Sequence, residues 1–68
     1  MEISHNYSRG MRFYDIYFIK SSAAATKEDV EEYIREEMNT PLGWRDLQMN
    51  NSVGDYNTWE VKVHNDWF

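Results

Sequence analysis

The most distinctive hydrophobic pattern lies at residues 11–20, MRFYDIYFIK, where aromatic and β-branched residues favour a β-strand. Alternate side chains of a strand point to opposite faces of a sheet. One set of alternate positions here includes Tyr17 and Ile19, and the other includes Tyr14 and Phe18. Because both sets are mostly apolar, the pattern predicts a central strand that is covered on both faces.

Residues 27–38 carry their apolar side chains at the spacing of an α-helix. Thr26 and Asp29 match the S/T-x-x-D/E pattern of a helix N-terminus, in which the threonine hydroxyl accepts a hydrogen bond from a free backbone N–H. Asn39 and Pro41 predict where the helix ends. The residues that share the apolar stripe are Val30, Tyr33, Ile34 and Met38.

Strand patterns also follow the helix. Residues 44–50 form a weaker one, in which strict alternation places Trp44 on one face and Leu47 on the other. Residues 58–64 alternate cleanly between apolar and polar positions, which predicts a half-buried strand. The turn-forming residues between these two segments predict a loop over residues 50–57.

Together these elements predict an α+β fold, with a single helix packed on a small three- to four-stranded, mostly antiparallel sheet in β-α-β-β order. Residues 1–10 are expected to form either a tail or an edge strand, and residues 11–68 a single α+β domain. A right-handed crossover through the helix could set the second strand parallel to the first.

Composition narrows the class of protein. The chain has 68 residues and a net charge of −5, which disfavours nonspecific binding to nucleic acid or to an anionic membrane and favours a basic partner. It has no cysteine, so disulfides and thiolate metal sites are excluded. The absence of a long apolar run or an apolar leader predicts a cytoplasmic protein that does not span a membrane.

Catalytic chemistry has little support in the sequence. No phosphate-binding glycine motif, nucleophile elbow or paired base is present, so we expect no enzymatic activity and no cofactor or metal site. The only histidines, His5 and His64, are expected to be solvated surface residues. Glu37 falls within the apolar stripe of the helix, and its carboxylate is expected to reach water at the last turn.

A surplus aromatic surface is the main functional indication, since one helix covers only one face of a sheet. The other face is covered by the chain ends (residues 1–10 with Trp67 and Phe68), by a second copy, or by a partner. Glu28, Glu32 and Glu36 lie four residues apart and form an acidic stripe on the helix. This stripe is either an ordinary solvated surface or a contact for a basic partner.

The sequence therefore favours a small, acidic, non-enzymatic protein-binding module, an inhibitor or accessory factor whose partner has a basic surface. In size and composition the chain resembles the small acidic accessory proteins of viruses, which implies a host protein as the partner. The alternatives are a homo-oligomeric structural protein, or a single-stranded nucleic-acid binder that uses sheet aromatics and a basic patch drawn from Arg9, Arg12, Lys20 and Arg45. The predicted partner-binding residues are Tyr14, Phe18, Glu28, Glu32, Glu36 and Trp44.

Overall fold

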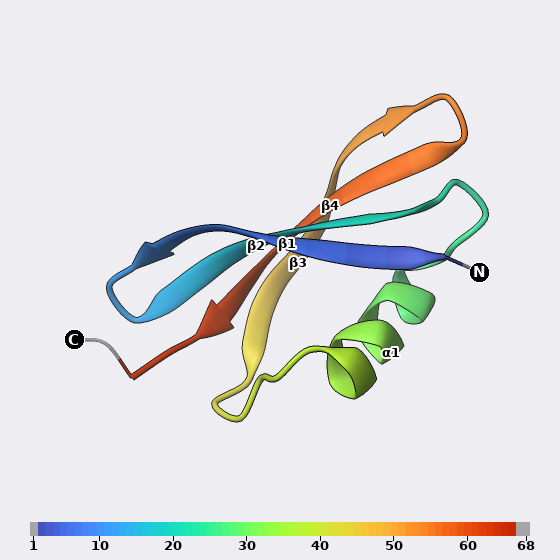
Figure 1. Cartoon of the computed structure of the whole chain (residues 1–68). Helices are drawn as coiled ribbons and strands as arrows, with labels where there is room; N and C mark the ends of the chain where they lie inside the picture. Colours follow the sequence, from blue (N-terminus) through green and yellow to red (C-terminus); the bar gives the residue numbers. More distant parts are fainter. Residues whose placement is uncertain (1, 67–68) are drawn as a thin grey trace.

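Four strands and one helix make up most of residues 2–66, the part of the chain that the structure describes. In this computed structural model the strands form one sheet in the order β1-β2-β4-β3, and every neighbouring pair is antiparallel (Figure 1). The fold is α+β, with the element order β-β-α-β-β. The elements are β1 (Ile3–Met11), β2 (Tyr14–Ser22), α1 (Lys27–Glu37), β3 (Trp44–Val53) and β4 (Tyr56–His64).

The element order corrects the β-α-β-β expectation, because the optional N-terminal strand is present. It occupies Ile3–Met11 and forms an edge of the sheet beside β2. The strand expected at residues 11–20 begins only at Tyr14, since Arg12 and Phe13 form the turn of the β1–β2 hairpin. Phe13 has a φ of 82°, a conformation that bulky residues rarely adopt, so its type gave no sign of a turn.

The connection through the helix does not place β3 next to β2, as a simple right-handed crossover would. Both β2 and β3 pair with β4 in antiparallel fashion, so β2 and β3 run in the same direction. They are not neighbours, however, because β4 lies between them. The last strand thus returns from β3 and fills the central position, which leaves no parallel pair in the sheet.

The helix covers one face of the sheet and completes the core there. As expected, Thr26 caps it: the Thr26 hydroxyl accepts from the Asp29 backbone N–H (3.2 Å), and the Asp29 carboxylate accepts from the Thr26 N–H (2.8 Å). The stripe residues Val30 and Ile34 are fully buried. The core that they complete consists of Ile19, Val30, Ile34, Met38, Leu47, Trp59, Val61 and Val63.

A bulge in β3 shifts its side chains relative to a regular strand. Arg45 pairs with Lys62 and Gln48 pairs with Glu60, so two residues, Asp46 and Leu47, lie opposite the single position between them. Asp46 has a φ of 56°, which aspartate tolerates better than most residues. The expectation that Trp44 and Leu47 lie on opposite faces is therefore wrong, because both pack against the core under the helix.

The β3–β4 hairpin is tighter than expected. Instead of a loop over residues 50–57, β3 continues to Val53 and β4 begins at Tyr56, which leaves Gly54 and Asp55 as the turn. Gly54 has a φ of 60°, and an added Cβ would meet no atom within 4 Å. The turn therefore requires glycine for its backbone conformation and not for space.

Replacing Gly54 with alanine should lower the free energy of unfolding by about 1–2 kcal/mol, because an L-residue at positive φ is strained. Urea denaturation would measure the change. Asparagine tolerates this conformation, so Gly54→Asn should lose less than Gly54→Ala. Equal losses in the two variants would show that the strain is not the cause.

Candidate binding surface

The face of the sheet opposite the helix carries the exposed rings of Phe18 and Tyr56, the half-buried ring of Tyr14 and several basic side chains. Tyr17 and Ile19 of β2 pack under the helix, so the alternate residues of β2 and their partners in register point the other way. Within residues 2–66 no helix or strand lies over these side chains. We call this surface the helix-free face and define it by Arg9, Tyr14, Ile16, Phe18, Lys20, Arg45, Tyr56, Glu60 and Lys62.

One row of this face crosses all four strands. Arg9 pairs with Ile16, Ile16 with Lys62, and Lys62 with Arg45. Neighbouring strands are about 4.8 Å apart, so three cations lie within about 15 Å of one another. Ile16 is only 3% exposed although the helix is on the other side, which means that neighbouring side chains cover it. The row therefore has an apolar centre between basic ends.

Tyr14 lies beside the end of this row that Lys62 and Arg45 form. The guanidinium carbon of Arg45 is 5.6 Å from the centre of the Tyr14 ring, and Lys62 Nζ is 5.2 Å from it. Cations within about 6 Å of a ring centre are attracted by its π-electrons. The ring and the two cations thus form one cluster with a planar apolar element and positive charge.

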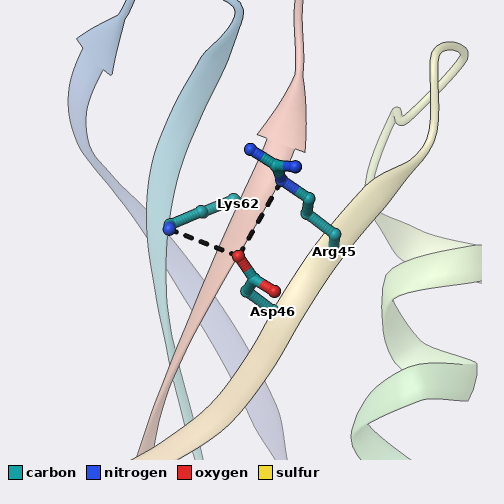
Figure 2. Close-up of polar contacts among 3 residues, drawn as sticks. All are labelled: Arg45, Asp46 and Lys62. Atoms are coloured by element: carbon teal, nitrogen blue, oxygen red, sulfur yellow. Dashed lines mark ion pairs between the residues drawn. The ribbon is translucent and has the colours of Figure 1, made fainter.

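The bulge adds an acid to this cluster. The Asp46 carboxylate lies 3.3 Å from Lys62 Nζ and 3.8 Å from Arg45 Nε (Figure 2). The Arg45 and Asp46 side chains are 55% and 54% exposed, so their ion pair is in water and contributes only about 0–1 kcal/mol. The Lys62 side chain is 28% exposed, so its pair with Asp46 is partly buried. Asp46 therefore pairs with both cations and leaves Arg45 open to solvent.

A second ring–cation pair lies at the other end of the helix-free face. Lys20 Nζ is 4.1 Å from the centre of the Tyr56 ring, and Tyr56 is 50% exposed. The pair borders an open depression of about 390 Å³ that Glu2, Ile3 and Ser4 also line. Known small-molecule sites have volumes of about 300–1,000 Å³. This depression is large enough to receive one flat ring beside Tyr56.

Phe18 lies between the two ring–cation clusters. It is 37% exposed and pairs in register with Asn6 of β1 and Glu60 of β4. Its ring is therefore open to a partner, and Glu60 is the acid closest to it in register. With Asp46, and with Glu2 beside Lys20 and Tyr56, the face carries three acids against the four cations Arg9, Lys20, Arg45 and Lys62, a net charge of +1.

The negative charge is concentrated on the opposite side of the molecule. The helix has six acids and two bases and so a net charge of −4, whereas the whole chain has a net charge of −5. Glu28, Glu32 and Glu36 are exposed there, as is Glu37. The structure therefore separates an acidic helix surface from a basic, aromatic sheet surface.

The six predicted partner-binding residues do not form one surface. Tyr14 and Phe18 lie on the helix-free face, whereas Glu28, Glu32 and Glu36 lie on the helix. Trp44 is half-buried against the core, because it pairs in register with the buried Val63 on the helix side of the sheet.

His5 also differs from the expectation of a solvated surface histidine. It is half-buried beside the helix, and a 2.6 Å hydrogen bond joins its Nδ1 to the Tyr33 hydroxyl. Burial, and to a smaller extent the Glu37 carboxylate, raises the pKa of Tyr33 above its usual value of 10.0. Both side chains belong to the packing between β1 and α1, which places them away from the helix-free face.

Several residues of the helix-free face were missed by sequence reasoning. The alternation of residues 58–64 places Lys62 on the polar side of its strand. It does not show that Lys62 lies beside Ile16, because no local pattern indicates that β4 pairs with β2. Tyr56 was placed in a loop, since the turn residues around it concealed the start of β4. Arg45 was recognised as basic, but its position beside Lys62 depends on the bulge at Asp46. The expectation that Trp67 and Phe68 cover this face lies outside the described residues.

Residues 2–66 were also compared with the patterns of a metal site and of a membrane-spanning helix. In that range no three histidine, aspartate or glutamate residues are grouped so that they could hold a metal ion. The helix described there is too short and too polar to cross a membrane. Comparison with family models, with curated proteins and with solved structures gives no match to this chain.

Proposed function

We propose that this chain is a small non-enzymatic binding module that acts as an inhibitor or accessory factor by occupying a surface of another macromolecule. Its contact surface is the helix-free face. The observation that carries the proposal is the exposure of Phe18, Tyr56 and Arg45 on a face that no helix or strand of residues 2–66 covers.

The composition of this face supports a contact role. Tyrosine and arginine are enriched among the residues that dominate binding energies, because they combine large apolar area with hydrogen-bonding groups. Tyr14, Phe18 and Tyr56 would supply the apolar contact. Arg45 and Lys62 would steer an anionic partner and fix its register, since exposed charges mainly affect association rate and specificity.

The expected chemistry of the partner changes with the geometry. A protein with one basic surface fits the acidic stripe of the helix, but a flat partner cannot contact that stripe and the helix-free face together. A partner on the helix-free face must offer anionic groups to Lys62 and Arg45 and apolar or planar groups to the rings. The stripe of Glu28, Glu32 and Glu36 is left as a solvated surface in this proposal.

Site-specific photo-crosslinking would test the surface without knowledge of the partner. Replacing Phe18 with p-benzoylphenylalanine should give crosslinked products in extracts of the cells that express the protein. The same replacement at Glu32, which is exposed on the helix, serves as the matched control and should give none. Products at Glu32 but not at Phe18 would contradict the proposal. Self-crosslinking of the purified protein at Phe18, with a melting temperature that rises with concentration, would assign the face to a homo-oligomer instead.

A further inference from the structure

We propose that the partner of the helix-free face is a single-stranded nucleic acid, an inference that rests on the binding function proposed above. Its basis is the pairing of tyrosine rings with cations across this face. A nucleotide presents a planar base next to a phosphate, so it needs a ring and a cation side by side. The Tyr14 and Tyr56 clusters both provide that combination.

The rings are suited to bases that are not stacked on each other. Base stacking on aromatic side chains contributes about 1–3 kcal/mol per base and tolerates any sequence. Phe18 lies between the two ring–cation clusters and is open to solvent, so it extends the series of rings along the face. A duplex keeps its bases stacked inside, and it could use only the cations. The geometry therefore favours a single strand over a duplex.

The net charge of −5 does not by itself prevent this contact, because half of the acids lie on the helix and not on the helix-free face. Six of the 12 acids are on the helix, and the sheet lies between them and the ligand. Packed layers are about 10 Å apart, and the Debye length at physiological ionic strength is about 8 Å. The helix charges are therefore partly screened at the helix-free face, where the local charge is +1.

A protein partner fits the same face less well. It would have to place an acid against each cation and an apolar group against each adjacent ring. Asp46 already pairs with Arg45 and Lys62, which lowers the gain from a single acidic side chain. A phosphodiester chain carries repeated charge and releases bound counterions when it binds, so its gain grows with the number of cations engaged. The row from Arg9 to Arg45 carries three cations in sequence across the sheet, which suits a ligand with regularly spaced negative charges.

The salt dependence should be moderate. Three to four phosphates on Arg9, Lys20, Arg45 and Lys62 would give a slope of log K against log salt of about −2 to −3 for a single strand. Affinity should then fall about 20- to 50-fold between 50 and 200 mM salt. If the partner were instead a protein without a series of negative charges, the slope of log K against log salt would be smaller.

The test is fluorescence anisotropy of the whole protein with fluorescein-labelled dT12 and U12, and with a 12-base-pair duplex as competitor. We expect both single strands to bind and the duplex to compete weakly. Phe18→Leu keeps an apolar side chain but removes the ring, and it should weaken binding about 5- to 150-fold, the equivalent of one lost stack. The double variant Arg45→Gln/Lys62→Gln should make the salt slope shallower by about 1.4.

Two charge variants serve as matched controls. Glu60→Gln removes the acid beside Phe18 and should tighten binding, whereas Glu32→Gln on the helix should leave it within about 2-fold, since helix charges are screened. Circular dichroism would confirm that each variant remains folded. Equal effects of Glu60→Gln and Glu32→Gln would show that net charge, and not this face, controls binding.

The outcomes separate this inference from the function on which it rests. Failure of dT12 and U12 to bind at 50 mM salt, tight competition by the duplex, or wild-type affinity of Phe18→Leu would each overturn the nucleic-acid inference. If, in addition, a nuclease-resistant protein product is crosslinked at Phe18 in extracts, the binding function stands with a protein as partner. If Phe18 gives no product at all and the oligonucleotides do not bind, both proposals fail.

Discussion

Replacing Ile34 with alanine should lower the free energy of unfolding by about 2–5 kcal/mol, because the change removes buried methyl groups and leaves a cavity. Ile34 is 0% exposed and belongs to the core between α1 and the sheet. At roughly 0.05–0.15 kcal/mol per residue, a 68-residue domain has a total stability of only about 3–10 kcal/mol. We therefore expect Ile34→Ala to be partly or wholly unfolded at 37 °C.

Guanidinium denaturation followed by circular dichroism would measure this loss. Arg35→Ala, one position along on the exposed side of the helix, is the control and should change stability by less than about 0.5 kcal/mol. A loss below about 1 kcal/mol in Ile34→Ala would mean that the helix packs on the sheet less closely than the buried core indicates.

Replacing Ser21 with alanine should have the second-largest effect, a loss of about 1–3 kcal/mol. Trp59 donates its Nε1–H to the Ser21 hydroxyl at 2.8 Å, and the two residues are only 3% and 1% exposed. Without the hydroxyl, the indole N–H would be left buried and unpaired. The loss thus reflects an unsatisfied donor more than a missing hydrogen bond.

A double-mutant cycle would test that explanation. In a Trp59→Phe background there is no indole donor, so Ser21→Ala should then be close to neutral. Ser22→Ala, at the next position of β2 on the other face, should also have little effect. If Ser21→Ala were equally harmful with and without the indole, packing of the serine and not the hydrogen bond would be responsible.

The parts of the fold that could be predicted from sequence are those fixed by neighbouring residues. The helix, with Thr26 and Asp29 at its N-terminus, depends on contacts three residues apart, and its stripe of Val30 and Ile34 is buried as expected. The alternation around Trp59 likewise placed that side chain on the buried face of β4. These signals depend only on residues close in the sequence, so they can be recognised without knowing how distant segments pair.

The errors arose where distant segments or unusual backbone conformations decide the structure. The turn at Phe13 has positive φ in a residue type that disfavours it, and the bulge at Asp46 reverses the alternation expected for β3. The central position of β4 depends on pairing between segments about 40 residues apart. The aromatic half of the candidate surface, Tyr14 and Phe18, followed from alternation alone, but its basic half depended on these long-range features.

The central position of β4 also has a consequence for how the protein is made. Synthesis proceeds from the N-terminus, so β1, β2, α1 and β3 leave the ribosome before the strand that joins β2 to β3. Until residues 56–64 emerge, the buried side chains of β2 and α1 lack the Trp59 and Val61 layer against which they pack. Pairing of distant segments cannot begin until both are available. The β2–β4 and β3–β4 pairs can therefore form only after residues 56–64 have been made, whereas the β1–β2 hairpin can form earlier.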